Sequence, residues 1–179
     1  QWNNEMGIKL FRLSSQIFPW SDEYDITHLK DIVEINELML EIGQIATDGG
    51  QRLTMHPGPY NCDNFHLLND DTKKRLVIEN DDSPNEYSVK DLFDGIYQVI
   101  GIPITFDYFH HKFNTGGLTE EEALKMASIT WPEDITQCCH YSESRRKEKL
   151  DESIRAQAHS DLIYDKINTY GLEPDIVIE

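Results

Sequence analysis

Acidic and histidine side chains recur along this sequence directly after short apolar runs, a placement that suits metal chemistry. The residues concerned are His56, Glu79, Asp107 with His110, His140, His159 and Glu179. Imidazole and carboxylate together suit zinc, manganese or iron, and no thiolate ligand is needed. Seven such groups exceed what one ion requires, so the pattern indicates two or three clustered ions, which can split phosphodiesters. Any one of them alone is more often a helix cap, and the pattern does not name a substrate.

The elements that must position these residues alternate along the chain. Apolar runs predict strands at 8–13, 52–55, 75–78, 102–106, 138–139 and 175–178, and helical spacing predicts helices at 26–45, 89–100, 120–127, 150–157 and 162–170. Asp25 or Thr27 can cap the first helix, and Gly49-Gly50 ends it. Such alternation predicts an α/β fold whose parallel sheet is covered on both faces. In a parallel barrel the carboxyl ends of the strands share one face, so the scattered residues could converge there.

Composition sets the class of protein. The chain has 179 residues, a formal net charge of -17 and no apolar run of the ~20 residues that a membrane span needs. Its three cysteines (62, 138 and 139) form no disulfide framework, and no segment resembles a signal peptide, so we expect an intracellular protein of the cytoplasm or nucleus. Since the chain does not begin with Met, we expect sequence upstream. The acidity weighs against a nucleic-acid partner, but local charge decides affinity and bound cations offset acidic ligands.

Six short motifs, in order, resemble the UV-damage endonuclease family. They are 7–15 with 18–20, the HPGPYN segment at 56–61, RLVIENDD at 75–82, FDYFHH at 106–111, HYSE at 140–143 with HSD at 159–161, and DIVIE at 175–179. Each motif is short, but six in the family's order make a specific match along nearly the whole chain.

The resemblance implies a TIM (β/α)8 barrel with two or three divalent ions, manganese or else zinc. The activity implied is incision of double-stranded DNA 5′ to cyclobutane dimers and 6-4 products, by a monomer. The seven residues named above match the family's ligands, with Glu79 bridging two ions and with Glu79 and His110 in catalysis. Tyr60, flanked by Pro59 and Asn61, matches the lesion-probing segment. Arg145 and Arg146 are the local candidates for phosphate contact, although a solvated charged face explains them equally well.

Three departures from the family pattern stand out. Pro59 replaces a glutamine, and Cys138 stands where the family has a lysine that some members modify; we favour a core role for Cys138 over a ligand role. From Tyr60 to Glu79 there is no room for the helix, strand and second helix that the family has there, which places a missing segment between about 61 and 65. We therefore expect residues 1–179 to be a single barrel domain that shows about six of eight strands, without the first strand, that segment and a C-terminal helix.

Two other functions remain open at this point. A related barrel enzyme, either an abasic-site endonuclease or a sugar isomerase, would also place metal ligands at strand ends. A catalytically impaired homologue that binds DNA or a protein would explain Pro59 and Cys138.

Overall fold

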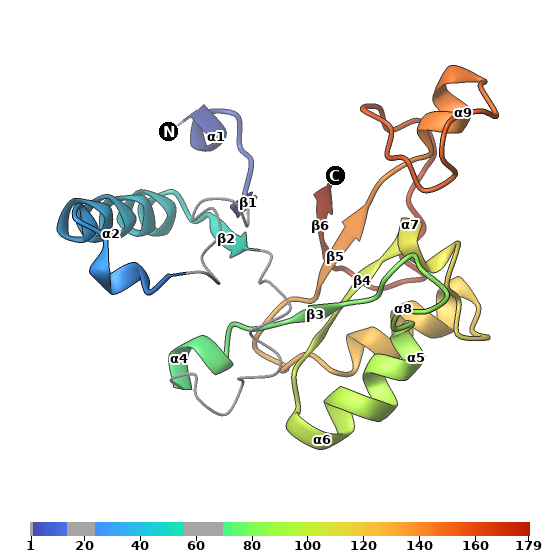
Figure 1. Cartoon of the computed structure of the whole chain (residues 1–179), viewed down its shortest axis with the longest axis horizontal. Coiled ribbons are helices and arrows are strands. Elements are labelled where there is room, and N and C mark those ends of the chain that lie inside the picture. The colour runs from blue at the N-terminus through green and yellow to red at the C-terminus, as the bar shows by residue number, and fades with distance from the viewer. Residues whose placement is uncertain (1, 14–23, 56–69) are drawn as a thin grey trace. The chain divides into compact units, whose positions relative to one another are not determined.

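Six short strands, all paired in parallel, occur in the part of the chain that the computed structural model describes, residues 2–13, 24–55 and 70–179 (Figure 1). They correspond to the six predicted strands, with small shifts at their ends. The chain divides into two units, residues 1–69 and 70–179. His56 and the segment Pro59, Tyr60 and Asn61 lie outside the described residues.

The first unit contains a β-α-β arrangement. Strands β1 (Leu10–Leu13) and β2 (Arg52–Met55) pair in parallel, and the helix α2 (Ile32–Asp48) lies between them in sequence. A single-turn helix, α1 (Trp2–Glu5), precedes β1. Lys9 Nζ donates a hydrogen bond to the Gly49 carbonyl at 2.8 Å, which joins the residue before β1 to the end of α2.

The long helix of the first unit starts later than the sequence predicts. Residues Ile26–His28 form a short 3-10 turn, η2, and α2 begins only at Ile32. Asp25 Oδ1 accepts from the Thr27 backbone N–H at 2.9 Å, so the predicted cap serves the 3-10 turn. The C-terminal prediction is confirmed, because α2 ends at Gly49 and Gly50 takes the positive φ of 59° that glycine tolerates.

The second unit contains a four-stranded parallel sheet in the order β3 (Ile78–Glu79), β4 (Ile104–Asp107), β5 (Cys138–Tyr141) and β6 (Asp175–Ile178). Asp107 pairs with His140, and His140 pairs with Val177, so neighbouring strands end at nearly the same level. A short helix, α4 (Asp70–Lys73), precedes β3. The carboxyl ends of four consecutive strands therefore meet at one edge of the sheet.

Helices cover this sheet on one side, as Figure 1 shows. The predicted helix at 89–100 is present as α5 (Val89–Leu92), a π-helical segment η4 (Phe93–Tyr97) and α6 (Gln98–Ile100). The next crossover contains α8 (Glu120–Ser128), and both α5 and α8 pack against β4. No helix within the described ranges is long and apolar enough to cross a membrane.

The hydrophobic core lies around β4 and β5. All four residues of each strand are buried. The fully buried side chains include Ile104, Phe106, Val89, Leu124 and Cys139. This core holds the strand ends in place.

Two helix predictions in the second unit are wrong. Residues 150–157 and 162–170 form turns and bends, and the helix of this region is α9 (Arg145–Lys149). Leu150 ends it with a left-handed φ of 51°. Beyond it, side-chain acceptors take the backbone donors: Asp151 Oδ1 accepts from Ser153 N at 2.9 Å and Glu143 Oε1 from Asp165 N at 3.1 Å. Such local bonds compete with the helix ladder and explain the loop.

Candidate metal centre

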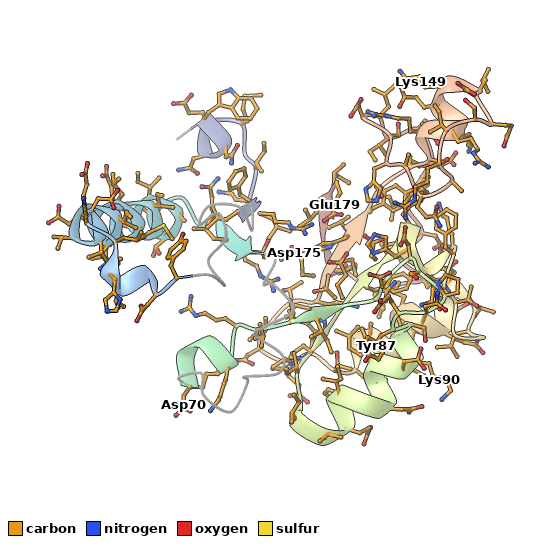
Figure 2. All side chains as sticks on the ribbon, viewed as in Figure 1. Asp70, Tyr87, Lys90, Lys149, Asp175 and Glu179 are labelled. Carbon is orange, nitrogen blue, oxygen red and sulfur yellow. The ribbon has the colours of Figure 1, made fainter. Side chains whose placement is uncertain are left out.

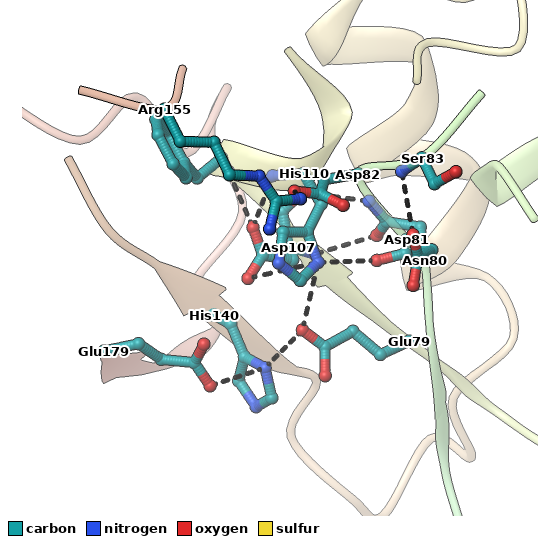
Figure 3. A network of polar contacts seen from close by, with 11 residues as sticks. Glu79, Asn80, Asp81, Asp82, Ser83, Asp107, His110, His140, Arg155 and Glu179 are labelled. Carbon is teal, nitrogen blue, oxygen red and sulfur yellow. Dashed lines mark hydrogen bonds and ion pairs between the residues drawn. The ribbon is translucent and has the colours of Figure 1, made fainter. Parts of the chain in front are cut away.

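Four strand-end residues, one from each strand of the second unit, gather into a single cluster. Glu79 ends β3, Asp107 ends β4, His140 lies in β5, and Glu179 directly follows β6. Each offers one ligand atom, and these atoms all lie within 4.8 Å of one another (Figure 3). Convergence at the carboxyl edge of the sheet, predicted from the sequence, is therefore confirmed for these four residues.

His140 lies between two carboxylates. Its Nδ1 is 2.9 Å from Glu79 Oε1 and 3.2 Å from Glu179 Oε1, and its side chain is only 9% exposed. Close carboxylates repel one another, and burial removes the water that would screen them. A divalent cation relieves both costs, so the composition and spacing of the cluster fit divalent-metal binding.

The two oxygens of Asp107 serve different purposes. Oδ1 accepts hydrogen bonds from Phe109 N at 2.7 Å and His110 N at 2.8 Å, and so caps the helix α7 (Tyr108–His111). Oδ2 is buried and has no hydrogen-bond partner among the residues the structure describes. Burial, with the nearby Glu79 charge adding to it, raises the pKa of Asp107 to about 6, although the His110 charge opposes this. A carboxylate oxygen that is buried and aimed into a ligand cluster fits a metal ligand.

Asn80, which is buried, fixes the position of Asp107. Its side-chain Nδ2 donates to the Asp107 carbonyl at 3.1 Å, and its Oδ1 accepts from the Asp107 backbone N–H at 2.9 Å. These two bonds join the ends of β3 and β4 at the cluster, so Asn80 orients Asp107.

His110 is held at the rim of the same cluster. Its Nδ1 lies 2.8 Å from the Asn80 carbonyl oxygen and 3.5 Å from Glu79 Oε1. Because a carbonyl only accepts, Nδ1 must donate the proton, which leaves Nε2 as the lone-pair nitrogen. Burial alone would lower the pKa of His110, but the Asp107 charge and the Asn80 carbonyl outweigh it and raise the pKa. His110 therefore belongs to the site as a neighbour of the four-residue cluster.

His159 reaches this region from the loop that follows β5. Its ring centroid is 5.8 Å from that of His110, and its backbone forms an isolated bridge with Ser144. Burial, aided by the His110 charge, lowers the pKa of His159, which favours the neutral imidazole that a metal ligand requires. The structure thus places His159 beside His110, outside the four-residue cluster.

Glu143, the last residue of the HYSE motif, is a buried carboxylate to which the sequence analysis gave no role. Tyr141 Oη donates to Glu143 Oε1 at 2.6 Å, and the backbone of Glu143 accepts from Ser160 N at 2.8 Å. Burial and this contact raise the pKa of Tyr141. Glu143 therefore ties the loop that carries His159 to the end of β5. The signal was hidden, because Glu143 opens a run of charges that normally faces solvent.

Cys138 and the two candidate arginines lie apart from the cluster. Cys138 is buried at 3% exposure, and its sulfur is not part of the four-residue group. Arg145 forms an ion pair with Asp161, and Arg146 donates two bonds to the Ile154 carbonyl, at 2.8 and 2.6 Å. Both arginines are used to shape their own loop.

Comparisons with known proteins give one consistent result. The family model "UV-endonuclease UvdE" matches residues 1–62 and 60–179. The UV-damage endonuclease of Schizosaccharomyces pombe is 28% identical over 92% of this chain and 37% of its own length. The UV DNA damage endonuclease of Clostridium perfringens is 24% identical over 100% of this chain and 56% of its own length. The chain therefore spans about a third to just over half of these relatives.

A solved structure shows the fold. The structure titled "Crystal Structure of SacUVDE" has a TM-score of 0.76 and 24% identity, over 99% of this chain and 76% of that one. This likeness confirms the predicted α/β fold of the TIM-barrel type. Since the family model covers the chain in two adjoining pieces, the chain belongs to the UV-endonuclease UvdE family.

Proposed function

We propose that this protein is a divalent-metal-dependent DNA repair endonuclease that incises double-stranded DNA 5′ to UV photoproducts such as cyclobutane dimers and 6-4 products. The observation that carries the proposal is the cluster of Glu79, Asp107, His140 and Glu179 at the carboxyl edge of the sheet. Membership of the UvdE family and the names of the relatives supply the substrate class.

By family resemblance the ions number two or three and are manganese or else zinc, and the carboxylate and imidazole donors of the cluster suit either metal. Glu79 Oε1 lies 2.9 Å from His140 Nδ1 and 3.5 Å from His110 Nδ1, so Glu79 reaches both histidines. Its role as a bridge between two ions is carried over from the family resemblance. His56 and His159 complete the ligand set by family resemblance. Ions bound there would supply positive charge to a scissile phosphodiester and acidify a water molecule.

The chain's own residues would orient the groups at the site. Asn80 holds Asp107 in place through its side chain. Its carbonyl keeps the proton of His110 on Nδ1, so Nε2 of His110 would be the nitrogen available to bind a metal ion. In this proposal Glu79 and His110 are the catalytic pair. Tyr60, Pro59 and Asn61 contact the lesion, and the protein acts as a monomer on a single barrel domain.

The test is an incision assay on a duplex that carries one cyclobutane dimer, with Mn²⁺ present and Glu79→Ala as the matched variant. We expect a nick immediately 5′ to the dimer, and a loss of about a thousandfold or more in the variant, since several kcal/mol of charge stabilisation depend on the site. A wild-type protein that binds Mn²⁺ but leaves this duplex intact would contradict the proposal. An abasic duplex run in parallel separates the related abasic-site activity, because nicking only there would assign that function.

A further inference from the structure

The segment between β5 and β6 contains six lysines and arginines, and four of them are bound within the segment itself. Arg145 pairs with Asp161, Lys147 Nζ donates to Asp165 Oδ2 at 2.7 Å, and Lys149 pairs with Glu148. Arg146 donates to the Ile154 carbonyl and also pairs with Glu152 at 3.1 Å. These cations hold the loop in shape, so their charge is already matched locally.

Arg155 differs from these four residues in its partner. Its nearest carboxylate is Asp82 on the segment that follows β3, with 3.6 Å between Nη2 and Oδ2. Figure 3 shows the Arg155 side chain beside Asp82, at the edge where Asp107 and His110 lie. Arg155 therefore brings a positive charge from the loop to the rim of the metal centre.

The guanidinium of Arg155 is loosely held. Its side chain is 74% exposed, and the 3.6 Å separation from Asp82 exceeds a normal N–H···O hydrogen bond. Nε donates to Gln157 Oε1 at 3.2 Å, and within residues 70–179 the guanidinium makes no other hydrogen bond. Exposed ion pairs of this kind contribute little to stability, so the arginine can turn to another anion at small cost.

We propose that Arg155 binds a backbone phosphate of the nucleic acid at the rim of the metal centre, a role that rests on the proposed endonuclease function. The rim is acidic and the whole chain carries a net charge of -17, so a polyanion is repelled except where positive charge faces it. The planar guanidinium matches two phosphate oxygens at once.

This assignment differs from the expectation that Arg145 and Arg146 carry the phosphate contact, which stays a prediction. Those two residues follow β5 closely in sequence, but both are engaged in the loop. The sequence analysis did not consider Arg155, because it lies beyond the run of charged residues at 143–152 and four residues before His159.

The experiment measures the dissociation constant of a labelled, dimer-containing duplex across a range of KCl concentrations, with Mn²⁺ present. For Arg155→Ala we expect affinity to fall about tenfold at low salt and the slope of log K against log salt to fall by about one. An undamaged duplex should lose affinity equally, because phosphate contacts carry no sequence information. Arg155→Lys should keep the slope and recover part of the affinity.

Lys149→Ala is the matched control, since it removes one positive charge from the same loop. We expect it to leave both affinity and slope unchanged, and Arg155→Ala to leave Mn²⁺ affinity and melting temperature unchanged. Asp82→Asn releases the guanidinium, so it should raise duplex affinity.

The outcomes separate this inference from the proposed function. If the wild type nicks the duplex and Arg155→Ala keeps the slope of Lys149→Ala, the assignment of Arg155 is overturned while the endonuclease function stands. A change in Mn²⁺ affinity without a change in slope would also overturn it, because Arg155 would then serve only as a counter-ion to Asp82. If the wild type binds with an Arg155-dependent slope but never nicks, the phosphate contact stands and the endonuclease function fails.

Discussion

The two units of the chain start from the same local pattern and reach different degrees of burial. In the second unit every residue of β4 and β5 is buried, and helices cover the sheet. In the first unit β1 has no buried residue, and α2 buries only Ala46 while Leu40 remains 75% exposed. The same local pattern therefore gives a buried sheet in one unit and an exposed one in the other.

The difference lies in the number of paired strands and in what covers them. A two-stranded sheet such as β1-β2 is marginal alone, whereas four strands with packed helices form a core that can fix side chains. The metal-centre residues that the structure describes all belong to the second unit. This comparison predicts that the second unit contains most of the stability and all of the described ligand geometry.

The largest expected contrast is between matched core and surface truncations. Phe106→Ala should lower the free energy of unfolding by about 3–5 kcal/mol, because a buried aromatic leaves a cavity. Leu40→Ala, at an exposed position of α2, should change it by less than about 0.5 kcal/mol. Denaturant unfolding measures both, and an equal loss for the two variants would show that α2 is covered in solution, which breaks the comparison.

The next effect is stabilisation by metal. At a Mn²⁺ concentration about a hundred times the dissociation constant, the free energy of unfolding should rise by about 2.7 kcal/mol, and chelation should reverse this. Asp107→Asn should weaken the effect, because it removes a buried carboxylate from the cluster. Hydrogen exchange shows where the protein is stabilised. On adding Mn²⁺ we expect exchange to slow at the ends of β3 to β6, and we expect the exchange rates in α2 to stay unchanged. Equal protection of α2 and of β3 to β6 would contradict a centre whose described ligands all lie in the second unit.

Much of this centre could be predicted from the sequence, for a physical reason. Glu79, Asp107, His140 and Glu179 each end an apolar run, and parallel strands necessarily bring their carboxyl ends together. The helices at 89–100 and 120–127 were also predictable, since Gly101 and Thr119 mark their ends with ordinary stop and cap signals. In the second unit, the signals that start and end helices and the parallel order of the strands led to the same prediction.

The two helix predictions that failed, at 150–157 and 162–170, concern a loop that depends on contacts distant in sequence. The loop after β5 has helical spacing, but Glu143 takes backbone donors that a helix would need, and only the fold brings it to Asp165. The roles of Arg145, Arg146 and Arg155 depend on partners that spacing does not reveal. The segment expected to be missing near residues 61–65 stays a prediction. The two family matches meeting at 60–62, and an alignment of 238 residues with the Clostridium perfringens relative, support it.

Substitutions of Asn80 test whether its bonds to the Asp107 backbone position Asp107 for metal binding. Asn80→Ala removes both bonds to the Asp107 backbone and should lower Mn²⁺ affinity about 10–100-fold, with about 1–3 kcal/mol lost in stability. Asn80→Asp keeps the acceptor and should restore the bond from the Asp107 N–H. Calorimetric titration with Mn²⁺ and unfolding curves measure the two effects separately. A loss of stability with unchanged Mn²⁺ affinity would mean that Asn80 is only structural.

The smallest effect compares helix caps in the two units. Thr119 Oγ1 accepts from Glu122 N at 3.2 Å, and Glu122 Oε2 accepts from Thr119 N at 2.8 Å, which forms a capping box for α8. Asp31, at the equivalent position of α2, makes no capping hydrogen bond with its side chain. Thr119→Ala should therefore cost about 1 kcal/mol, and Asp31→Ala should cost little. Thermal unfolding of both variants decides this. If Asp31→Ala proves as costly as Thr119→Ala, then α2 is capped in solution, and the first unit is better ordered than its exposed helix suggests.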